Sequence, residues 1–226
     1  MRINKYLAHN KYSTRRGADE LIEKGLVLIN GKKAVLGDKV EATDTVEVKG
    51  KKRTYRYVAY NKPRGIITHS AQEGEQEIKE ILPIEGLFPV GRLDKDSYGL
   101  IILTDDGRLT EALLNPDHAH EKEYIVQTLH ALPKDFKHQM ERGVVLGDYR
   151  TKPCVVRIQG AHKFAITLTE GKKHQIRRMC GVFGQSAVDL RRVRIMNIRL
   201  GQLESGQHRA IEGKELETFL SSVGLA

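Results

Sequence analysis

The sequence contains no tryptophan and only two cysteines, Cys154 and Cys180, among its 226 residues. Two distant cysteines that form no Cys-x-x-Cys pair provide neither a disulfide framework nor a structural zinc site. His118 and His120 lie close together in the chain, but no further ligands in a compatible arrangement accompany them. We therefore expect no bound metal, and nothing in the composition indicates a cofactor.

Long apolar runs are also missing. The chain begins with Met1-Arg2-Ile3-Asn4-Lys5, which is not the apolar start of a signal peptide. No apolar run approaches the roughly 18 residues that a membrane span requires. From these two observations we expect a cytosolic protein that has no membrane partner.

Among the charged residues of the chain, positive ones are in excess. The chain carries 38 Lys and Arg against 29 Asp and Glu, a formal net charge of +9. An excess of this size indicates a polyanionic partner, usually nucleic acid, although a basic protein without such a partner fits the same numbers. With 39% hydrophobic and 30% charged residues, the chain can form a packed core. Its length suits one large domain, or a small domain with a larger one.

The first fifty residues predict a compact unit of two short helices and a small sheet. Ile3 and Leu7 share one helical face, and Ser13 or Thr14 can cap a second helix. A strand is expected at 26–29, and Asn30-Gly31 is a strong signal for a hairpin turn. A further strand is expected at 44–48.

Arg15 and Arg16 lie at the start of the second expected helix, where their charge opposes the helix dipole. A phosphate bound at that helix start would relieve the conflict. Lys32 and Lys33 can extend the same basic face, although for either lysine alone a solvated basic surface is the preferred interpretation. The stretch as a whole resembles the alpha-L RNA-binding domain, which is named for a small-subunit ribosomal protein. The matching segments are Arg2-Ile3-Asn4-Lys5-Tyr6-Leu7, Ser13-Thr14-Arg15-Arg16 and Gly25-Leu26-Val27-Leu28-Ile29-Asn30-Gly31-Lys32.

Residues 91–99 predict a polar, glycine-bounded loop that leads into an apolar strand at 100–104. The loop carries Asp94 and Asp96, and such loops are a common place for reactive groups. A glycosidase pair would need carboxyls on opposite sides of a bond, typically roughly 5 Å or more apart, and residues two apart on one loop seldom achieve that. From spacing alone, Asp94 is more often structural than catalytic.

Three sequence blocks change this interpretation. They resemble, in the same order, the motifs of bacterial pseudouridine synthases of the RsuA/RluB/RluE/RluF family, and most closely its RluF branch. The blocks are Gly91-Arg92-Leu93-Asp94-Lys95-Asp96-Ser97-x-Gly99-Leu100, Glu121-Lys122-Glu123-Tyr124 and Gly171-Lys172-Lys173-His174-Gln175-Ile176-Arg177-Arg178-Met179-Cys180. One departure is Lys173, since this family often has arginine in that place.

The resemblance implies an α+β fold, in which a small alpha-L RNA-binding domain precedes a catalytic domain with a mixed, largely antiparallel sheet flanked by helices. We expect the domains at 1–49 and 57–226, joined by a basic linker at 50–56. Strand signals at 57–60, 100–104, 124–128 and 164–168 are compatible with this fold. In the third block, Ile176, Met179 and Val182 have helical spacing, which predicts one buried side.

The implied activity is that of an isomerase, an intramolecular transferase that converts uridine in structured RNA to pseudouridine. The N1–C1′ bond breaks, the uracil turns, and C5 joins the sugar, with no metal or cofactor. Asp94 would start the reaction as a nucleophile or as a base at the sugar, and the sequence leaves both open. Arg177 would orient Asp94. Tyr124 would hold the flipped base by stacking.

The resemblance also implies partners and contacts. Large-subunit ribosomal RNA is the expected substrate, transfer RNA is a possible second one, and the protein is expected to be a monomer. The predicted RNA-binding residues are Arg2, Lys5, Arg15, Arg16, Lys32, Arg92, Lys122, Lys173, Gln175 and Arg178.

Two other functional classes fit part of the sequence. A non-catalytic RNA-binding or ribosome-assembly factor would explain the charge and the first fifty residues equally well. It gives no reason for Asp94, Tyr124 and Arg177 to stand where the family places them. A glycoside or phosphate hydrolase would need a second, separated carboxylate motif or metal ligands.

Overall fold

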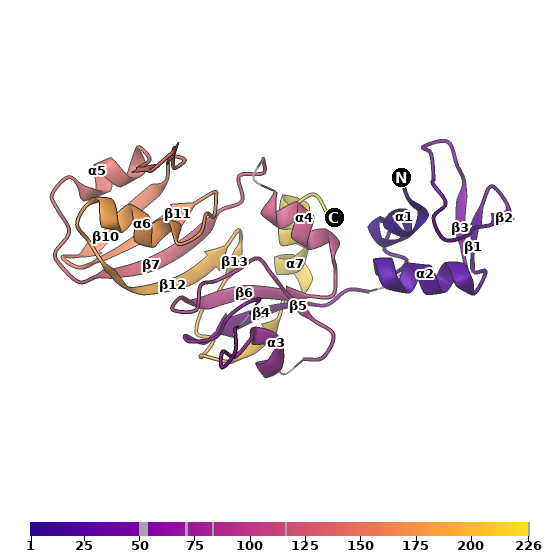
Figure 1. The fold of residues 1–226 in the computed structure, drawn as a ribbon, viewed down its shortest axis with the longest axis horizontal. Helices are drawn as coiled ribbons and strands as arrows, with labels where there is room; N and C mark the ends of the chain where they lie inside the picture. Colours follow the sequence, from indigo (N-terminus) through magenta and orange to yellow (C-terminus); the bar gives the residue numbers. More distant parts are fainter. Residues whose placement is uncertain (50–53, 71, 83, 116, 226) are drawn as a thin grey trace.

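The computed structural model describes residues 1–49, 54–70, 72–82, 84–115 and 117–225, and it describes Arg16 by its backbone alone. The chain folds into a small N-terminal unit and a larger sheet-based unit (Figure 1). The expected linker at 50–56 lies partly outside the described residues, because 50–53 are not among them.

The N-terminal unit packs two helices, α1 (Ile3–His9) and α2 (Arg15–Glu23), beside a three-stranded sheet. The strand order is β2 (Lys32–Lys33), β1 (Val27–Ile29) and β3 (Val46–Val48). Thr14 caps α2, since its hydroxyl accepts a hydrogen bond from the Gly17 amide at 3.0 Å. Asn30 and Gly31 both have positive φ, 50° and 77°, as a two-residue type I′ hairpin turn requires. The helices and the turn are thus confirmed.

The larger unit is built on one mixed sheet, which has nine strands in the described part of the chain. Its main order is β10 (Val155–Gly160), β11 (Lys163–Leu168), β7 (Lys122–Thr128), β12 (Ala187–Ile195), β6 (Tyr98–Thr104), β4 (Tyr57–Lys62) and β14 (His208–Ala210). Outside this order, β13 (Ile198–Arg199) pairs with β12 and β5 (Phe88–Val90) pairs with β6. A separate hairpin joins β8 (Val145–Leu146) to β9 (Tyr149–Arg150).

Among the described strand pairs, β6 with β12 is the parallel one and the others are antiparallel. The helices that flank the sheet are α3 (Ile78–Ile81), α4 (Arg108–Leu114), α5 (Phe136–Glu141), α6 (Gln175–Val182) and α7 (Gly213–Ser222). The expected α+β architecture, with a mixed and largely antiparallel sheet, is confirmed.

The helices cover different parts of the two sheet faces (Figure 1). On one face, α5 and α6 pack on the half of the sheet that contains β7, β10 and β11, while α3 packs on β4 and β6. On the other face, α4 and α7 pack on the half of the sheet that contains β4, β5 and β6, over the side chains that alternate with those under α3. The first face therefore has a middle region between α6 and α3, and the row of candidate residues described below lies there.

One side chain of α6 does not follow the expected pattern. Ile176 and Met179 are buried, as predicted, but Val182 is 55% exposed. Val182 is the last residue of the helix, and Cys180, four residues after Ile176, occupies the buried position instead. The buried side is therefore confirmed for the first two residues and wrong for Val182.

The side chains of Tyr55 and Arg108 connect the N-terminal unit to the sheet unit. The Tyr55 hydroxyl donates a hydrogen bond to the Ser13 carbonyl at 3.0 Å, and Arg108 donates one to the His9 carbonyl at 3.1 Å. The guanidinium of Arg108 also lies 5.2 Å from the centre of the Tyr55 ring. No helix in the described ranges is long and apolar enough to span a membrane.

Candidate active site

Four residues with consecutive pairings form a row across the middle of the sheet. Tyr124 on β7 pairs with Arg192 on β12, Arg192 pairs with Gly99 on β6, and Gly99 pairs with Lys62 on β4. Directly paired residues face the same side of a sheet, so Tyr124, Arg192 and Lys62 share one face. Strand pairing thus brings together four residues that are far apart in the sequence, the first at position 62 and the last at position 192.

Gly99 is what allows β6 to approach β12 at this row. Its φ is +106°, and a Cβ there would lie 2.3 Å from the Arg192 carbonyl oxygen and 2.9 Å from its amide nitrogen. Any larger residue would have to push the two strands apart. The close approach places the start of β6, and the loop before it, against the middle of β12.

That loop carries Asp94, and it is fastened by its main chain. Each carbonyl from Arg92 to Asp96 accepts a hydrogen bond, so the position of Asp94 is set from both sides. In chain order the donors are Arg192 Nη1 at 3.3 Å, Thr68 Oγ1 at 2.8 Å, Ser97 N at 3.0 Å, Gly65 N at 2.8 Å and Arg177 Nη2 at 3.3 Å. The Thr68 hydroxyl is buried and also accepts a bond from the Leu93 amide at 3.1 Å.

The Asp94 side chain itself is partly accessible, with 35% of its surface exposed. Its Oδ1 lies 3.5 Å from Nε2 of His174, the residue that precedes α6 and has φ of +50°. His174 is half exposed, so this contact adds little stability and leaves the carboxylate open to a ligand. Sequence reasoning did not find His174, although its place beside the start of α6 was visible in the third block.

Arg177, which the resemblance implies as the residue that orients Asp94, makes no direct bond with the Asp94 carboxylate in the described part of the chain. Among the described residues, its guanidinium donates instead to the carbonyls of Ala187, at 2.5 Å, and Asp96, at 3.3 Å. Both acceptors are main-chain atoms, and Asp96 lies on the same loop two residues after Asp94. In this structure Arg177 therefore supports the Asp94 loop through its backbone and ties it to β12.

Tyr124 lies on the same face of the sheet as Arg192, whose guanidinium bonds to the Asp94 loop. Its ring is partly buried, and the carbon of the Arg192 guanidinium lies 6.0 Å from its centre. The two side chains come from directly opposite positions of β7 and β12. An aromatic face at this place suits the stacking role that the sequence predicts for Tyr124.

Lys62 is a buried cation that sequence reasoning missed. Its side chain is fully buried, and its ammonium donates to the carbonyls of Pro63 at 2.8 Å and Ile66 at 2.6 Å. Burial, helped by repulsion from Arg192, lowers the pKa of Lys62 to about 8, while Asp94 and Asp96 act in the opposite direction. The signal available in the sequence was a lysine at the end of a strand, directly before Pro63.

Lys122, a predicted RNA contact, is half-buried, and its ammonium donates to the His120 carbonyl at 3.0 Å. Burial, with repulsion from Arg192 as the smaller cause, lowers the pKa of Lys122 to about 8 as well. Lys122 therefore lies partly inside the site, near Arg192, and is not a fully exposed surface lysine.

Gln175 occupies a different place from the one expected for an RNA contact. It is 4% exposed, and its amide group bonds to Glu170 at 2.7 Å and to the Lys172 backbone at 2.9 Å. Because these bonds use both ends of the amide, Gln175 closes the turn that precedes α6. The expectation of an RNA contact by Gln175 is not supported by this geometry.

The other predicted RNA-binding residues lie at the surface. Arg178 is exposed and donates to the Leu146 carbonyl at 3.0 Å, which fastens the β8–β9 hairpin to α6. The side chain of Arg16 lies outside the described residues. The exposed members of the set are Arg2, Lys5, Arg15, Lys32, Arg92, Lys173 and Arg178.

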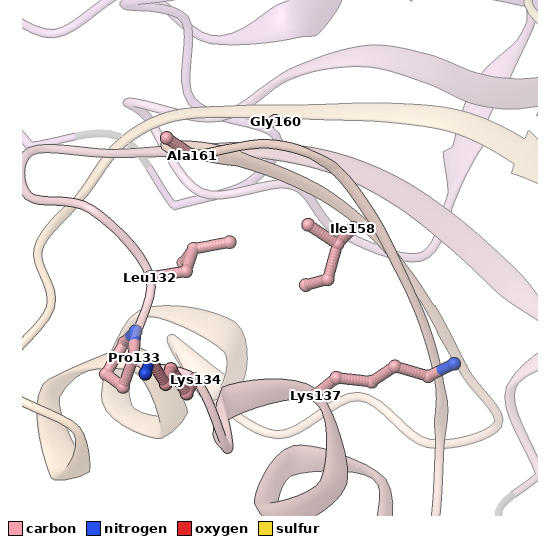
Figure 2. Close-up of a pocket in the computed structure, with 7 residues that line it drawn as sticks. All are labelled: Leu132, Pro133, Lys134, Lys137, Ile158, Gly160 and Ala161. Atoms are coloured by element: carbon pink, nitrogen blue, oxygen red, sulfur yellow. The ribbon is translucent and has the colours of Figure 1, made fainter.

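Two further features lie away from the row. His118 and His120 both contact the Ala112 carbonyl, at 3.3 Å and 2.9 Å, and no group of three potential metal ligands occurs in the described chain. A hollow lies between the turn after β10 and the start of α5, and Figure 2 shows Leu132 and Ile158 at it. Its lining within the described chain includes none of the predicted site residues.

Comparisons with known proteins identify relatives along most of the chain. The RNA pseudouridylate synthase family model matches residues 56–181, and the S4 domain model matches residues 1–46. The dual-specificity RNA pseudouridine synthase RluF of Salmonella typhi is 40% identical over 223 residues, which cover 95% of this chain and 77% of that protein. The ribosomal large subunit pseudouridine synthase B of Bacillus subtilis (strain 168) is 31% identical over 230 residues, which cover 96% and 94%.

A solved structure described as a pseudouridylate synthase superposes with a TM-score of 0.70 at 26% identity, and the match covers 99% of both chains. The fold and the order of the two units are therefore shared along nearly the whole chain.

The lowered pKa of Lys62 predicts a pH dependence of stability. Between about pH 8 and 10.5 the folded state gives up its proton while the unfolded state keeps it, so the free energy of unfolding rises with pH. Lys62→Met should remove about half of this rise, because Lys122 contributes in the same way. Urea unfolding of the wild type and the variant at several pH values between 7 and 10.5 measures this pH dependence of the free energy of unfolding.

The matched control is Lys79→Met. Glu77 raises the pKa of Lys79, so this lysine keeps its proton in the folded state throughout that range. The control should show the same rise as the wild type. An unaltered rise in Lys62→Met would contradict the assignment to Lys62.

Proposed function

This chain belongs to the family of RNA pseudouridine synthases, and we propose that its substrate is a uridine in large-subunit ribosomal RNA. The enzyme is an isomerase that converts uridine in RNA to pseudouridine. The observation that carries the proposed site is the Asp94 loop, fastened by its carbonyls over a row that contains Tyr124. The sequence motifs assign the reaction to Asp94, Tyr124 and Arg177; with this geometry, Asp94 and Tyr124 are the proposed catalytic residues and Arg177 positions the Asp94 loop.

The arrangement suits a reaction that begins at the sugar of a flipped nucleotide. A uridine in folded RNA must leave its stack before its N1–C1′ bond can be reached. The Tyr124 ring would hold the uracil, and the partly exposed Asp94 carboxylate would act at the sugar. Arg177 would keep Asp94 in place through the Asp96 carbonyl. Asp94 can act as a nucleophile or as a base with this geometry.

The substrate is proposed from the named relatives. One relative is described as acting on the ribosomal large subunit and another as having dual specificity. We extend the first description to this chain and keep transfer RNA as the second substrate class. The protein would act as a monomer, in the cytoplasm where ribosomal RNA is assembled.

Asp94→Asn should abolish the reaction. Uridine C5 loses its hydrogen when it bonds to the sugar, so RNA labelled with tritium at C5 reports turnover. The variant should release tritium more than about a thousandfold more slowly, because the amide can neither attack nor accept a proton. Its circular dichroism should match the wild type, since the loop is held by main-chain carbonyls.

Asp96→Asn is the matched control on the same loop. Its carbonyl accepts the bond from Arg177, so the change at its exposed side chain should leave most of the activity. Full tritium release by Asp94→Asn would exclude Asp94 from catalysis. No release by the wild type on any RNA would favour a non-catalytic binding factor.

We propose that the N-terminal unit at 1–49 binds RNA phosphates through its exposed basic residues. Arg15→Ala with Arg16→Ala should therefore weaken RNA binding and reduce the slope of log K against log salt, because fewer counterions are released. Binding titrations at several salt concentrations measure it. Lys137→Ala with Lys214→Ala removes the same charge from exposed positions on the other unit and should change the slope less.

The substrate is tested by mapping pseudouridine in cells with and without this protein. One site in large-subunit ribosomal RNA should lose its modification when the protein is absent. Loss confined to transfer RNA would replace the proposed substrate with the second class. An unchanged map in both RNAs would overturn both assignments.

A further inference from the structure

Arg192 is a buried cation whose charge no carboxylate neutralises among the described residues. It is 3% exposed, and its Nε donates to the Leu100 carbonyl at 2.7 Å. Its Nη1 donates to the Arg92 carbonyl at 3.3 Å, and its Nη2 is buried without a hydrogen-bond partner. Two residues further along β12, Arg194 pairs with Glu121 at 2.9 Å and Glu123 at 2.8 Å, as is usual for an enclosed arginine.

A gain in the stability of the fold does not explain why Arg192 is buried without a carboxylate partner. Moving a guanidinium out of water costs free energy, and two neutral carbonyls return only part of it. The cost is increased by Lys62 and Lys122, since each of them is repelled by Arg192. Apolar side chains of similar size often replace buried charges without loss of stability. A contribution to the reaction is the better explanation for Arg192.

The contacts of Arg192 indicate what that contribution is. Its Nη1 holds the carbonyl two residues before Asp94, and its guanidinium carbon lies 6.0 Å from the centre of the Tyr124 ring. One rigid, planar group therefore bonds to the loop of the carboxylate and lies within cation–π range of the aromatic ring. The remaining bond, to Leu100 on β6, fixes the guanidinium to the strand that follows the loop.

We propose that Arg192 is a positioning residue that sets the distance and orientation of the Asp94 loop relative to Tyr124. It acts through these two groups and does not touch the substrate. The proposal rests on the proposed roles of Asp94 and Tyr124. It explains why the side chain is an arginine, because the two carbonyls lie on different segments and need donors from different nitrogens of one planar group.

The test compares Arg192→Met and Arg192→Lys with the wild type. Three quantities are measured: the free energy of unfolding in urea, the affinity for a large-subunit ribosomal RNA transcript, and the single-turnover rate of tritium release. Arg192→Met should keep the stability and the RNA affinity, yet release tritium about a hundredfold more slowly, since a misplacement of about 1 Å costs a factor of this size. Arg192→Lys keeps the charge without the planar fork, and we expect it to restore little of the rate.

Arg194→Met is the matched control, because it removes an arginine from the same strand that does not contact the Asp94 loop or Tyr124. Its single-turnover rate per folded molecule should equal that of the wild type. A double variant, Arg192→Met with Tyr124→Phe, should lose less than the product of the two single losses, since both changes disturb the same arrangement.

Three results would overturn the proposal: a wild-type rate in Arg192→Met, full recovery in Arg192→Lys, or a loss that only follows the folded fraction. If Arg192→Met does not fold, Arg192→Lys carries the same comparison, and a wild-type rate in it is decisive. Failure of the proposed function gives a different result, because the wild type would then release no tritium.

Discussion

The parallel contact between β6 and β12 is the constraint on which the site depends. Gly99 brings the two strands so close that a Cβ would lie 2.3 Å from the Arg192 carbonyl oxygen. That approach places the Asp94 loop beside β12, within reach of Arg192 and Arg177. The geometry of the proposed site therefore arises from main-chain pairing, and the position of Asp94 is set by carbonyls that any sequence would supply. What the sequence must contribute is the glycine and the donors.

The site concentrates positive charge where a sheet would ordinarily bury apolar side chains. Lys62 is fully buried and Arg192 nearly so, and both bond mainly to main-chain carbonyls. Carbonyl dipoles lower the cost of these charges but do not cancel them. The interior of the site is thus set to favour negative charge. In the proposed reaction the electron pair of the broken N1–C1′ bond stays with the uracil whether Asp94 attacks the sugar or removes a proton from it, so an interior of this sign suits both routes.

The local sequence pattern predicted most of the helices and strands, and the family motifs predicted Asp94, Tyr124 and Arg177 as site residues. The N-terminal helices and the strands at 57–60, 100–104 and 124–128 followed from periodicity, because each depends on its own residues. The contacts of Arg177, Lys62 and Arg192 were not predictable, since they depend on which strands become neighbours. An arginine on a strand looks the same in sequence whether it faces solvent or the Asp94 loop. Gln175 looked like an RNA contact for the same reason, although its amide closes a turn.

The two proposed roles of positive charge, RNA binding at the surface and positioning inside the site, respond differently to the salt concentration. The charges of the N-terminal unit, such as Arg15 and Lys32, are exposed, so salt screens them over roughly 10 Å at 0.1 M. The charges of Lys62 and Arg192 are enclosed, and salt reaches them far less. Raising the salt concentration should then weaken the capture of RNA while leaving the chemistry of RNA already bound almost unchanged. In the proposed mechanism, the net charge of +9, which first indicated a nucleic-acid partner, thus combines a surface that attracts RNA with an interior that arranges the reacting groups.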